Sequence, residues 1–182
     1  MMENMNKQAR LSEHFTLGEL TKTSVKSLDG NSPGREEIEN LKRLCLWLEE
    51  LRRRYNERYV ISIGATRRGQ APCDVCDDHS GASPRVSQEE PIVITSGYRS
   101  ETVNRCVGGA YSSNHLTGCA VDIRCAGVEQ ALRYAVILLD YADESKQDFD
   151  ELLIERNRKG HYWVHFAVRL KDNRRRTMFL LV

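Results

Sequence analysis

A long polar interval limits the fold of this sequence more than any other feature. Residues 65–90 are rich in Gly, Pro, Ser and Asp, and they show no apolar periodicity. Helical spacing dominates before this interval, whereas β-branched runs dominate after it. Leading helices followed by strands with one helix between them favour an α+β fold over an alternating β/α order. We therefore expect a single domain, 1–182, with a central antiparallel sheet, flanking helices and a loop insertion at 65–90.

The part before the loop is predicted to be helical. Asn31–Pro33 offers a helix cap and a first-turn proline. The segment Leu11–Leu20 predicts short helical turns that dock as an arm, and Val60–Ile63 predicts a short strand. The apolar residues that recur at helical spacing after the cap are Ile38, Leu41, Leu44, Cys45, Leu48 and Tyr55.

The part after the loop predicts a sheet backed by one helix. Strands are expected at Pro91–Thr95, Val121–Ile123, Leu152–Ile154 and Trp163–Val168, with a polar turn at Arg156–Gly160. The residues at helical spacing in between are Val128, Leu132, Ala135, Val136 and Leu139.

Charge and composition exclude several classes of protein. The chain has 182 residues with 27 Lys plus Arg against 26 Asp plus Glu, a net charge of +1. This balance supplies no general field for nucleic acid, so we expect no nucleic-acid partner. No apolar stretch is long enough for membrane insertion, and the first residues lack a secretory signal, so we expect synthesis in the cytoplasm. The six cysteines are expected to be mostly free thiols, and the chain to be a monomer.

Two groups of residues could bind a metal ion. His115, Asp122 and His165 offer two imidazoles and one carboxylate, a set that suits catalytic zinc and leaves a fourth position open. The alternative is that each of them simply satisfies hydrogen bonds. In the loop, Cys73-x-x-Cys76-x-x-His79 is compatible with a structural zinc site, a redox-active thiol pair or a mobile loop.

The spacing of motifs in the second half resembles a known peptidase family. The motifs are Ser96-Gly97-Tyr98-Arg99-Ser100, Gly108-Gly109, Ser113-x-His115-x-x-Gly118-x-Ala120-x-Asp122 and Trp163-x-His165. They resemble the zinc peptidases that group D-alanyl-D-alanine carboxypeptidases, dipeptidases and phage L-alanyl-D-glutamate endopeptidases. The resemblance spans about residues 11–168, and that family shares its fold with the amino-terminal signalling domain of hedgehog proteins.

The resemblance implies roles for the polar residues. His115, Asp122 and His165 would bind one zinc ion, and Arg99 would contact the scissile carbonyl oxygen or a substrate carboxylate. The family uses a carboxylate before the last histidine as general acid and base. Glu155 is the candidate in this sequence, with Asp150 and Glu151 as alternatives.

Three further residues are expected at the substrate. Ser113 would steady the site by hydrogen bonding, and Tyr98 belongs to the matched motif. Trp163 occupies a position where some relatives have another histidine, so it either lines a substrate subsite or packs in the core. His161 is the nearest replacement for that imidazole.

The resemblance predicts a zinc-dependent peptidase that hydrolyses peptidoglycan stem peptides, of D-Ala-D-Ala carboxypeptidase or L-Ala-D-Glu endopeptidase type. One alternative is a catalytically inactive zinc-containing binding module of the same fold. Another is a metal-free structural or phage tail component. A chain made in the cytoplasm could reach the cell wall by phage-type release. The Arg174-Arg175-Arg176 run is expected to be a solvated surface or tail.

Overall fold

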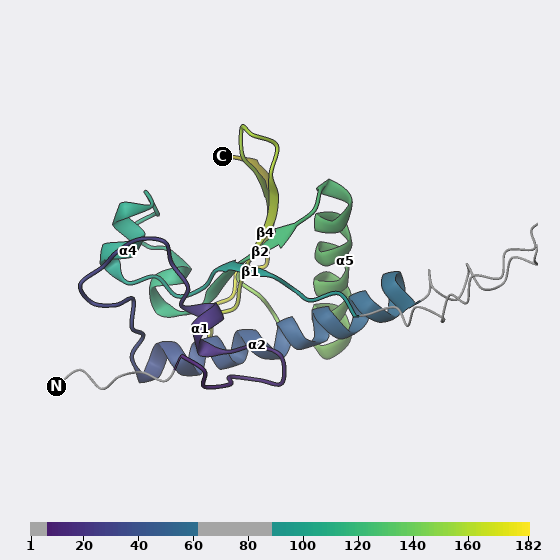
Figure 1. Cartoon of the computed structure of the whole chain (residues 1–182). Helices are drawn as coiled ribbons and strands as arrows, with labels where there is room; N and C mark the ends of the chain where they lie inside the picture. Colours follow the sequence, from purple (N-terminus) through teal and green to yellow (C-terminus); the bar gives the residue numbers. More distant parts are fainter. Residues whose placement is uncertain (1–6, 62–88) are drawn as a thin grey trace, which may run out of the picture.

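The computed structural model describes residues 7–61 and 89–182, and its elements are those of an α+β protein (Figure 1). The predicted fold class is therefore confirmed. The N-terminal part holds α1 (Leu17–Leu20), α2 (Arg35–Tyr55) and the π-helical turn η1 (Asn56–Ile61). The second part holds β1 (Ile94–Ser96), α4 (Glu101–Cys106), η2 (Asn114–Thr117), β2 (Ala120–Cys125), α5 (Val128–Ser145), β3 (Glu151–Arg156), β4 (Tyr162–Ala167) and β5 (Arg176–Leu181). Within these described residues, no helix combines the length and apolar character needed to cross a bilayer.

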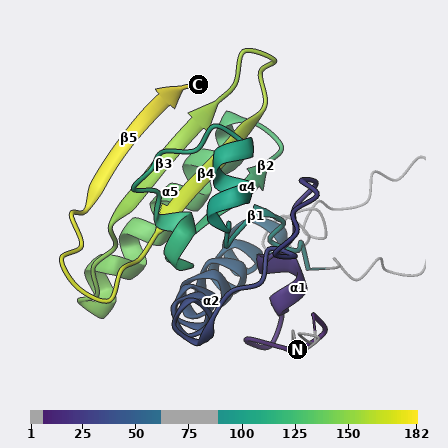
Figure 2. The ribbon, with the colours of Figure 1, turned by 90° about the vertical axis from the view of Figure 1, so that its left-hand side faces the viewer.

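The strands form one sheet in the order β1-β2-β4-β3-β5, which Figure 2 shows with β5 at one edge and β1 at the other. All pairs are antiparallel except β3 with β5, which run parallel. Paired residues lie on the same face, and successive residues alternate between faces. The central strands therefore divide into two sets of side chains. The residues of one face are all buried in the core: Val121, Ile123, Leu152, Ile154, Val164 and Phe166.

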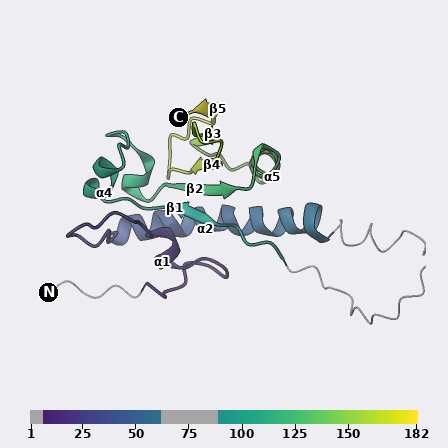
Figure 3. The same cartoon turned by 45° about the horizontal axis from the view of Figure 1, so that its top comes forward.

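That apolar face packs on α2 and α5, which also contact each other. Figure 3 shows α2 running beneath β1 and β2, and α5 across the strands from α4. The Trp47 ring of α2 lies 5.2 Å from Phe166 on β4 and 4.8 Å from Tyr141 on α5. Leu44 and Leu48 of the same helix are fully buried. The predicted amphipathic helix is thus confirmed, and it leaves the opposite face of the sheet for polar side chains.

The cap predicted for this helix has a different role. The helix begins at Arg35 after the N-cap Gly34, rather than at Asn31–Pro33. Asn31 adopts a positive φ of 51°, a conformation that Asn tolerates better than most residues. Its side chain donates to the Thr21 and Tyr98 carbonyls and accepts from the Ser100 backbone N–H. Asn31 therefore connects the N-terminal arm to the motif around Arg99.

Three other predictions about the elements are corrected. The chain forms a π-helical turn at Asn56–Ile61, so the strand expected at Val60–Ile63 is wrong within the described residues. The strand expected at Pro91–Thr95 is only Ile94–Ser96, with an irregular register between its ends. The edge strand β5 was not predicted, because the arginines at its start favoured a solvated tail over the apolar run Met178–Val182 that follows them.

The helix α5 forms as predicted but buries another side. Val128, Leu132 and Val136 are exposed. The buried residues of α5 are Ala131, Tyr134, Ala135, Ile137, Leu138 and Ala142. Apolar residues lie on most sides of this helix, so periodicity alone did not select the stripe that meets the sheet.

The N-terminal arm docks beside β1 through backbone contacts. Thr16 and Glu19 form a capping box at the start of α1. The Tyr98 N–H donates to the Leu20 carbonyl at 2.7 Å. A Cβ on Gly97 would lie 2.3 Å from that same carbonyl oxygen, so glycine is required for this close approach.

We expect Gly97→Ala to lower the free energy of unfolding by about 1–3 kcal/mol, the usual cost of forcing extra volume into a packed site. The added methyl group must displace the Leu20 backbone rather than a flexible side chain. Chemical denaturation measures the change. Gly127→Ala is the matched control, because a Cβ there meets nothing within 4 Å; an equal loss in both variants would contradict the explanation.

Candidate metal centre

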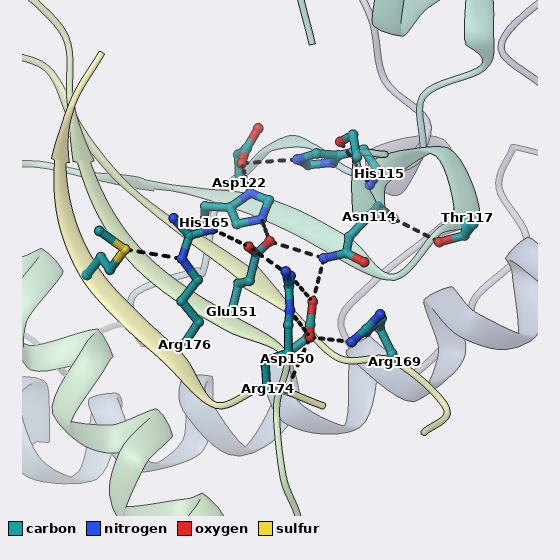
Figure 4. Close-up of polar contacts among 12 residues, drawn as sticks. Asn114, His115, Thr117, Asp122, Asp150, Glu151, His165, Arg169, Arg174 and Arg176 are labelled. Atoms are coloured by element: carbon teal, nitrogen blue, oxygen red, sulfur yellow. Dashed lines mark hydrogen bonds and ion pairs between the residues drawn. The ribbon is translucent and has the colours of Figure 1, made fainter. Parts of the chain in front are cut away.

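The polar face of the sheet brings His115, Asp122 and His165 together from three elements. His115 lies on η2, Asp122 on β2 and His165 on β4, where Asp122 and His165 are paired in register. One potential ligand atom from each residue lies within 4.8 Å of the others. Figure 4 shows the three side chains converging. The exposed fractions of His115, Asp122 and His165 are only 2%, 8% and 9%, so all three are buried.

The orientation of His115 is fixed by the Gly97 backbone. Its Nδ1 lies 2.6 Å from the Gly97 carbonyl oxygen, which can only accept a hydrogen bond. Nδ1 therefore carries a proton, and Nε2, the other ring nitrogen, lies 3.3 Å from Asp122 Oδ1. A histidine ligand held by such a hydrogen bond to a carbonyl is typical of metal sites.

His165 is held between two carboxylates. Its Nδ1 lies 2.9 Å from Asp122 Oδ1, and its Nε2 lies 3.5 Å from Glu151 Oε2. Burial disfavours the charged imidazole, but Asp122 and Glu151 outweigh it and raise the pKa of His165 to about 9. The ring thus has one nitrogen directed at the cluster and the other at a supporting carboxylate.

Asp122 is charged despite its burial. Burial acts against the carboxylate, yet the neighbouring His115 and His165 hold the pKa of Asp122 well below its usual range. Its Oδ2 also accepts from Arg99 Nη2 at 2.5 Å, and Arg99 Nε donates to Ser96 Oγ at 2.8 Å. The structure therefore places Arg99 at the edge of the cluster, anchored by two residues of the sheet.

This donor set fits zinc. Two imidazoles and one carboxylate supply three ligands and leave a position for water or substrate, as in catalytic zinc sites. His115 is oriented by its hydrogen bond to the Gly97 carbonyl oxygen, and His165 is oriented by its contact with Glu151. Supporting interactions of this kind are typical of histidine metal ligands. The residues that would hold the ion are the three that the sequence motif predicted.

The three carboxylates considered as general base differ in their surroundings. Glu155 is paired with Trp163 on the face that carries His165. Burial raises the pKa of Glu155, and Asp122 adds to this, whereas His165 and a hydrogen bond from Trp163 oppose it. By contrast, a hydrogen bond from His165 lowers the pKa of Glu151 to about 2. A base with a raised pKa is better suited to proton transfer near neutral pH, which favours Glu155.

Asp150 is held in a network of ion pairs (Figure 4). It is fully buried and receives three hydrogen bonds from Arg174, two from the guanidinium at 2.8 and 2.7 Å and one from the backbone N–H at 3.2 Å. It also pairs with Arg169 at 2.9 Å. Asn114, next to His115, donates to both Asp150 and Glu151. The network therefore links the η2 loop to the start of β3, and it leaves Asp150 no free oxygen for proton transfer.

The arginine run lies on the exposed surface, as predicted, but it is not a tail, and its side chains are paired with carboxylates. Arg174 pairs with Asp150 and Glu151, Arg175 with Asp143 and Asp148, and Arg176 with Glu151. Arg176 is also the first residue of β5. Sequence reasoning missed these pairs because the carboxylates lie more than 20 residues away in the chain.

We expect Asp150→Asn to destabilise the fold by roughly 2 kcal/mol near neutral pH. Burial opposes the charge, but Arg174 and Asn114 lower the pKa of Asp150 to about 2 from 3.8. A lowered pKa stabilises the folded state above about pH 4, and this contribution is lost as the pH falls toward 2.

Urea denaturation of wild type and variant at about pH 7 and about pH 3 checks this, and the difference should shrink by about half at the lower pH. A difference that stays constant with pH would contradict the assignment.

Ser113, Trp163 and Tyr98, which were expected at the substrate, lie in three different environments in the structure. Ser113 caps η2, and its Oγ accepts from the His115 backbone N–H at 3.3 Å. Trp163 is half-buried on the polar face beside Glu155. Tyr98 packs against the apolar core, and burial together with the Glu37 carboxylate raises the pKa of its hydroxyl. Tyr98 thus belongs with the N-terminal side of the fold rather than with the ligand cluster.

The cysteines are described in part. Cys45, Cys106, Cys119 and Cys125 are free thiols, as expected. The possible site at Cys73, Cys76 and His79 lies outside the described residues. The supporting residues Asn31 and Asn114 were missed by sequence reasoning, since a single asparagine in a turn gives no signal of a distant partner.

Comparison with known proteins supports the resemblance. Residues 83–159 match the family model described as Peptidase M15. The match contains Arg99, His115, Asp122 and Glu155, and it ends six residues before His165. No curated protein gives a significant match. The predicted resemblance to zinc peptidases is therefore confirmed, and this family implies a zinc metallopeptidase.

Proposed function

We propose that this chain, which resembles the Peptidase M15 family, hydrolyses a peptide bond in peptidoglycan stem peptides, as a carboxypeptidase or an L-Ala-D-Glu endopeptidase. The observation that carries the proposal is the convergence of His115, Asp122 and His165 within 4.8 Å on one face of the sheet. Glu155 and Arg99 flank this cluster with the charges that amide hydrolysis needs.

His115, Asp122 and His165 would hold one zinc ion. The chemistry that zinc supplies when bound is polarisation of a carbonyl oxygen and acidification of a water molecule. The hydrogen bond to Gly97 and the contact with Glu151 keep the two rings directed at the cluster. This preorganisation lowers the cost of assembling the site at the moment of reaction.

Glu155 acts as the proton carrier in this proposal. It accepts a proton from the attacking water, whose oxygen bonds to the carbonyl carbon, and then gives that proton to the leaving nitrogen. The carbon–nitrogen bond breaks, and the products are a carboxylic acid and an amine. The raised pKa of Glu155 suits both the removal and the return of the proton.

Arg99 stabilises the developing negative charge. Its Nε is engaged by Ser96 and its Nη2 by Asp122, which fixes the plane of the guanidinium beside the cluster. A guanidinium stays charged at all working pH values and offers further N–H groups to a substrate oxygen. We assign these remaining donors to the scissile carbonyl oxygen.

Digestion of purified muropeptides tests the proposal. We expect the zinc-loaded protein to release a product whose mass identifies the bond cleaved, and a chelator to stop the reaction until zinc is restored. Zinc binding with no cleavage of any muropeptide would contradict the proposal and favour the inactive binding module.

A further inference from the structure

Asp122 and His165 are paired across β2 and β4, and the next pair on the same face contains Arg124, which has no role in the proposed mechanism. Arg124 on β2 is paired with Trp163 on β4, and Trp163 is paired with Glu155 on β3. These residues lie two positions along their strands from Asp122, His165 and Leu153, on the same face. Two positions along a strand correspond to about 7 Å. Arg124 is therefore separated from the ligand cluster by about the length of one substrate amino acid. Trp163 lies between Arg124 and Glu155 in this row.

Arg124 and Trp163 line a hollow of about 330 Å³. Thr95, Cys125, His161 and Tyr162 complete its wall. This volume is at the lower end of the range for small-ligand sites. The hollow lies at the end of the β2 and β4 ladder, so a substrate that crosses the ligand cluster along these strands would extend into it.

The charge of Arg124 lacks a partner within the described part of the chain. Its side chain is exposed, and no carboxylate of residues 7–61 or 89–182 forms an ion pair with it. Its backbone N–H donates to the Val93 carbonyl, which fixes the strand without engaging the guanidinium. Two other arginines near this face, Arg99 and Arg176, are paired with Asp122 and Glu151.

We propose that Arg124 and Trp163 form a substrate subsite that binds a carboxylate group next to the scissile bond. A guanidinium binds a carboxylate through two parallel hydrogen bonds, and the indole offers a flat apolar wall to the carbon chain that bears it. The inference rests on the proposed function, and it specifies the substrate class as peptides with a free carboxylate within one residue of the bond cleaved. Stem peptides offer two such groups, the α-carboxylate of γ-linked D-glutamate and the carboxylate at the C-terminus.

The test measures binding without relying on cleavage. L-alanyl-γ-D-glutamyl-L-lysine is titrated by calorimetry into the zinc-loaded full chain that carries Glu155→Gln, the reference protein of this test, because that substitution is expected to keep the zinc and slow cleavage. Mass spectrometry confirms that the peptide is intact afterwards. Two further forms carry an amide in place of either the D-glutamate α-carboxylate or the terminal carboxylate. We expect one of the two amides to bind about tenfold to a hundredfold more weakly than the free peptide, since a charged hydrogen bond is lost. That amide identifies the carboxylate.

The variants then assign the effect to Arg124. Arg124→Gln should weaken binding of the free peptide by the same factor and leave binding of the identified amide unchanged. Arg124→Lys should retain part of the affinity. Arg105→Gln is the matched control, an exposed arginine on α4 that changes the net charge equally.

Binding of the free peptide by the Arg124→Gln variant of the reference protein within about twofold of the reference protein itself would overturn the proposal. Equal losses for free and amidated peptide, or no measurable binding by the reference protein, would also overturn it. A failure of the proposed function alone is recognised by a different result. In that case Arg124 still binds the carboxylate, but the wild-type protein cleaves no muropeptide.

Discussion

Glu155→Gln is expected to lower kcat about a hundredfold to ten-thousandfold, while the protein keeps its zinc. The amide has nearly the same volume as the carboxylate but cannot take the proton of the attacking water. Zinc is retained because Glu155 lies outside the cluster of ligand atoms formed by His115, Asp122 and His165. The measurement is the initial rate on the muropeptide that wild type cleaves, with zinc content determined on the same sample.

The control must be a carboxylate whose substitution does not disturb the candidate zinc ligands. Glu151 touches His165 and pairs with Arg176, so its substitution would disturb a zinc ligand and the fold together. Glu129→Gln is a better control, because Glu129 is an exposed carboxylate on α5 that pairs only with Arg133 among the ion pairs of the described residues. If Glu155→Gln keeps more than about a tenth of the wild-type kcat, the proton carrier is another group.

The second large effect is expected at the metal ligands. We expect His115→Ala to weaken zinc binding by more than about a hundredfold, because it removes a direct ligand and supporting residues alone are worth about tenfold to a hundredfold. Activity should fall to background at the same time. Competition with a chromogenic chelator measures the affinity, and muropeptide digestion measures the activity.

His161→Ala is the matched control for the zinc affinity alone, because His161 lines the hollow beside Arg124 and is not a control for activity. His161 is exposed, precedes β4 and makes its side-chain contact with Asn157, away from the ligand cluster. It should therefore keep wild-type zinc affinity. Equal zinc affinity in His115→Ala and wild type would mean that the ion is held elsewhere, and the assignment of η2 as a ligand loop would be wrong.

The geometry of the candidate ligands could be anticipated from sequence because it depends on short-range rules. Asp122 and His165 fall in apolar strands where alternation places every second side chain on one face, and their pairing sets them side by side. His115 follows Ser113, whose hydroxyl caps the turn, and precedes Gly118, which takes the positive φ of 68° that ends it. The alternation and the turn depend on a few neighbouring residues. The pairing of Asp122 with His165 joins residues 43 positions apart, and it was expected only because the motifs resemble a known family.

The supporting interactions could not be anticipated because they join distant parts of the chain. Nothing near Asn31 indicates that it bonds the Ser100 backbone 69 residues away. Likewise, the ion pair of Arg174 with Asp150 and the parallel pairing of β5 with β3 depend on the closed sheet. Charge runs look solvated in sequence, whereas the folded chain supplies partners that only topology determines.

Zinc content of the purified wild-type chain is the most direct test of the central claim. The protein is exposed to excess zinc, dialysed against metal-free buffer and assayed by elemental analysis against protein concentration. We predict about one zinc ion per chain, bound by His115, Asp122 and His165. A chain that retains no zinc after this treatment would contradict the claim that this face of the sheet is a metallopeptidase centre.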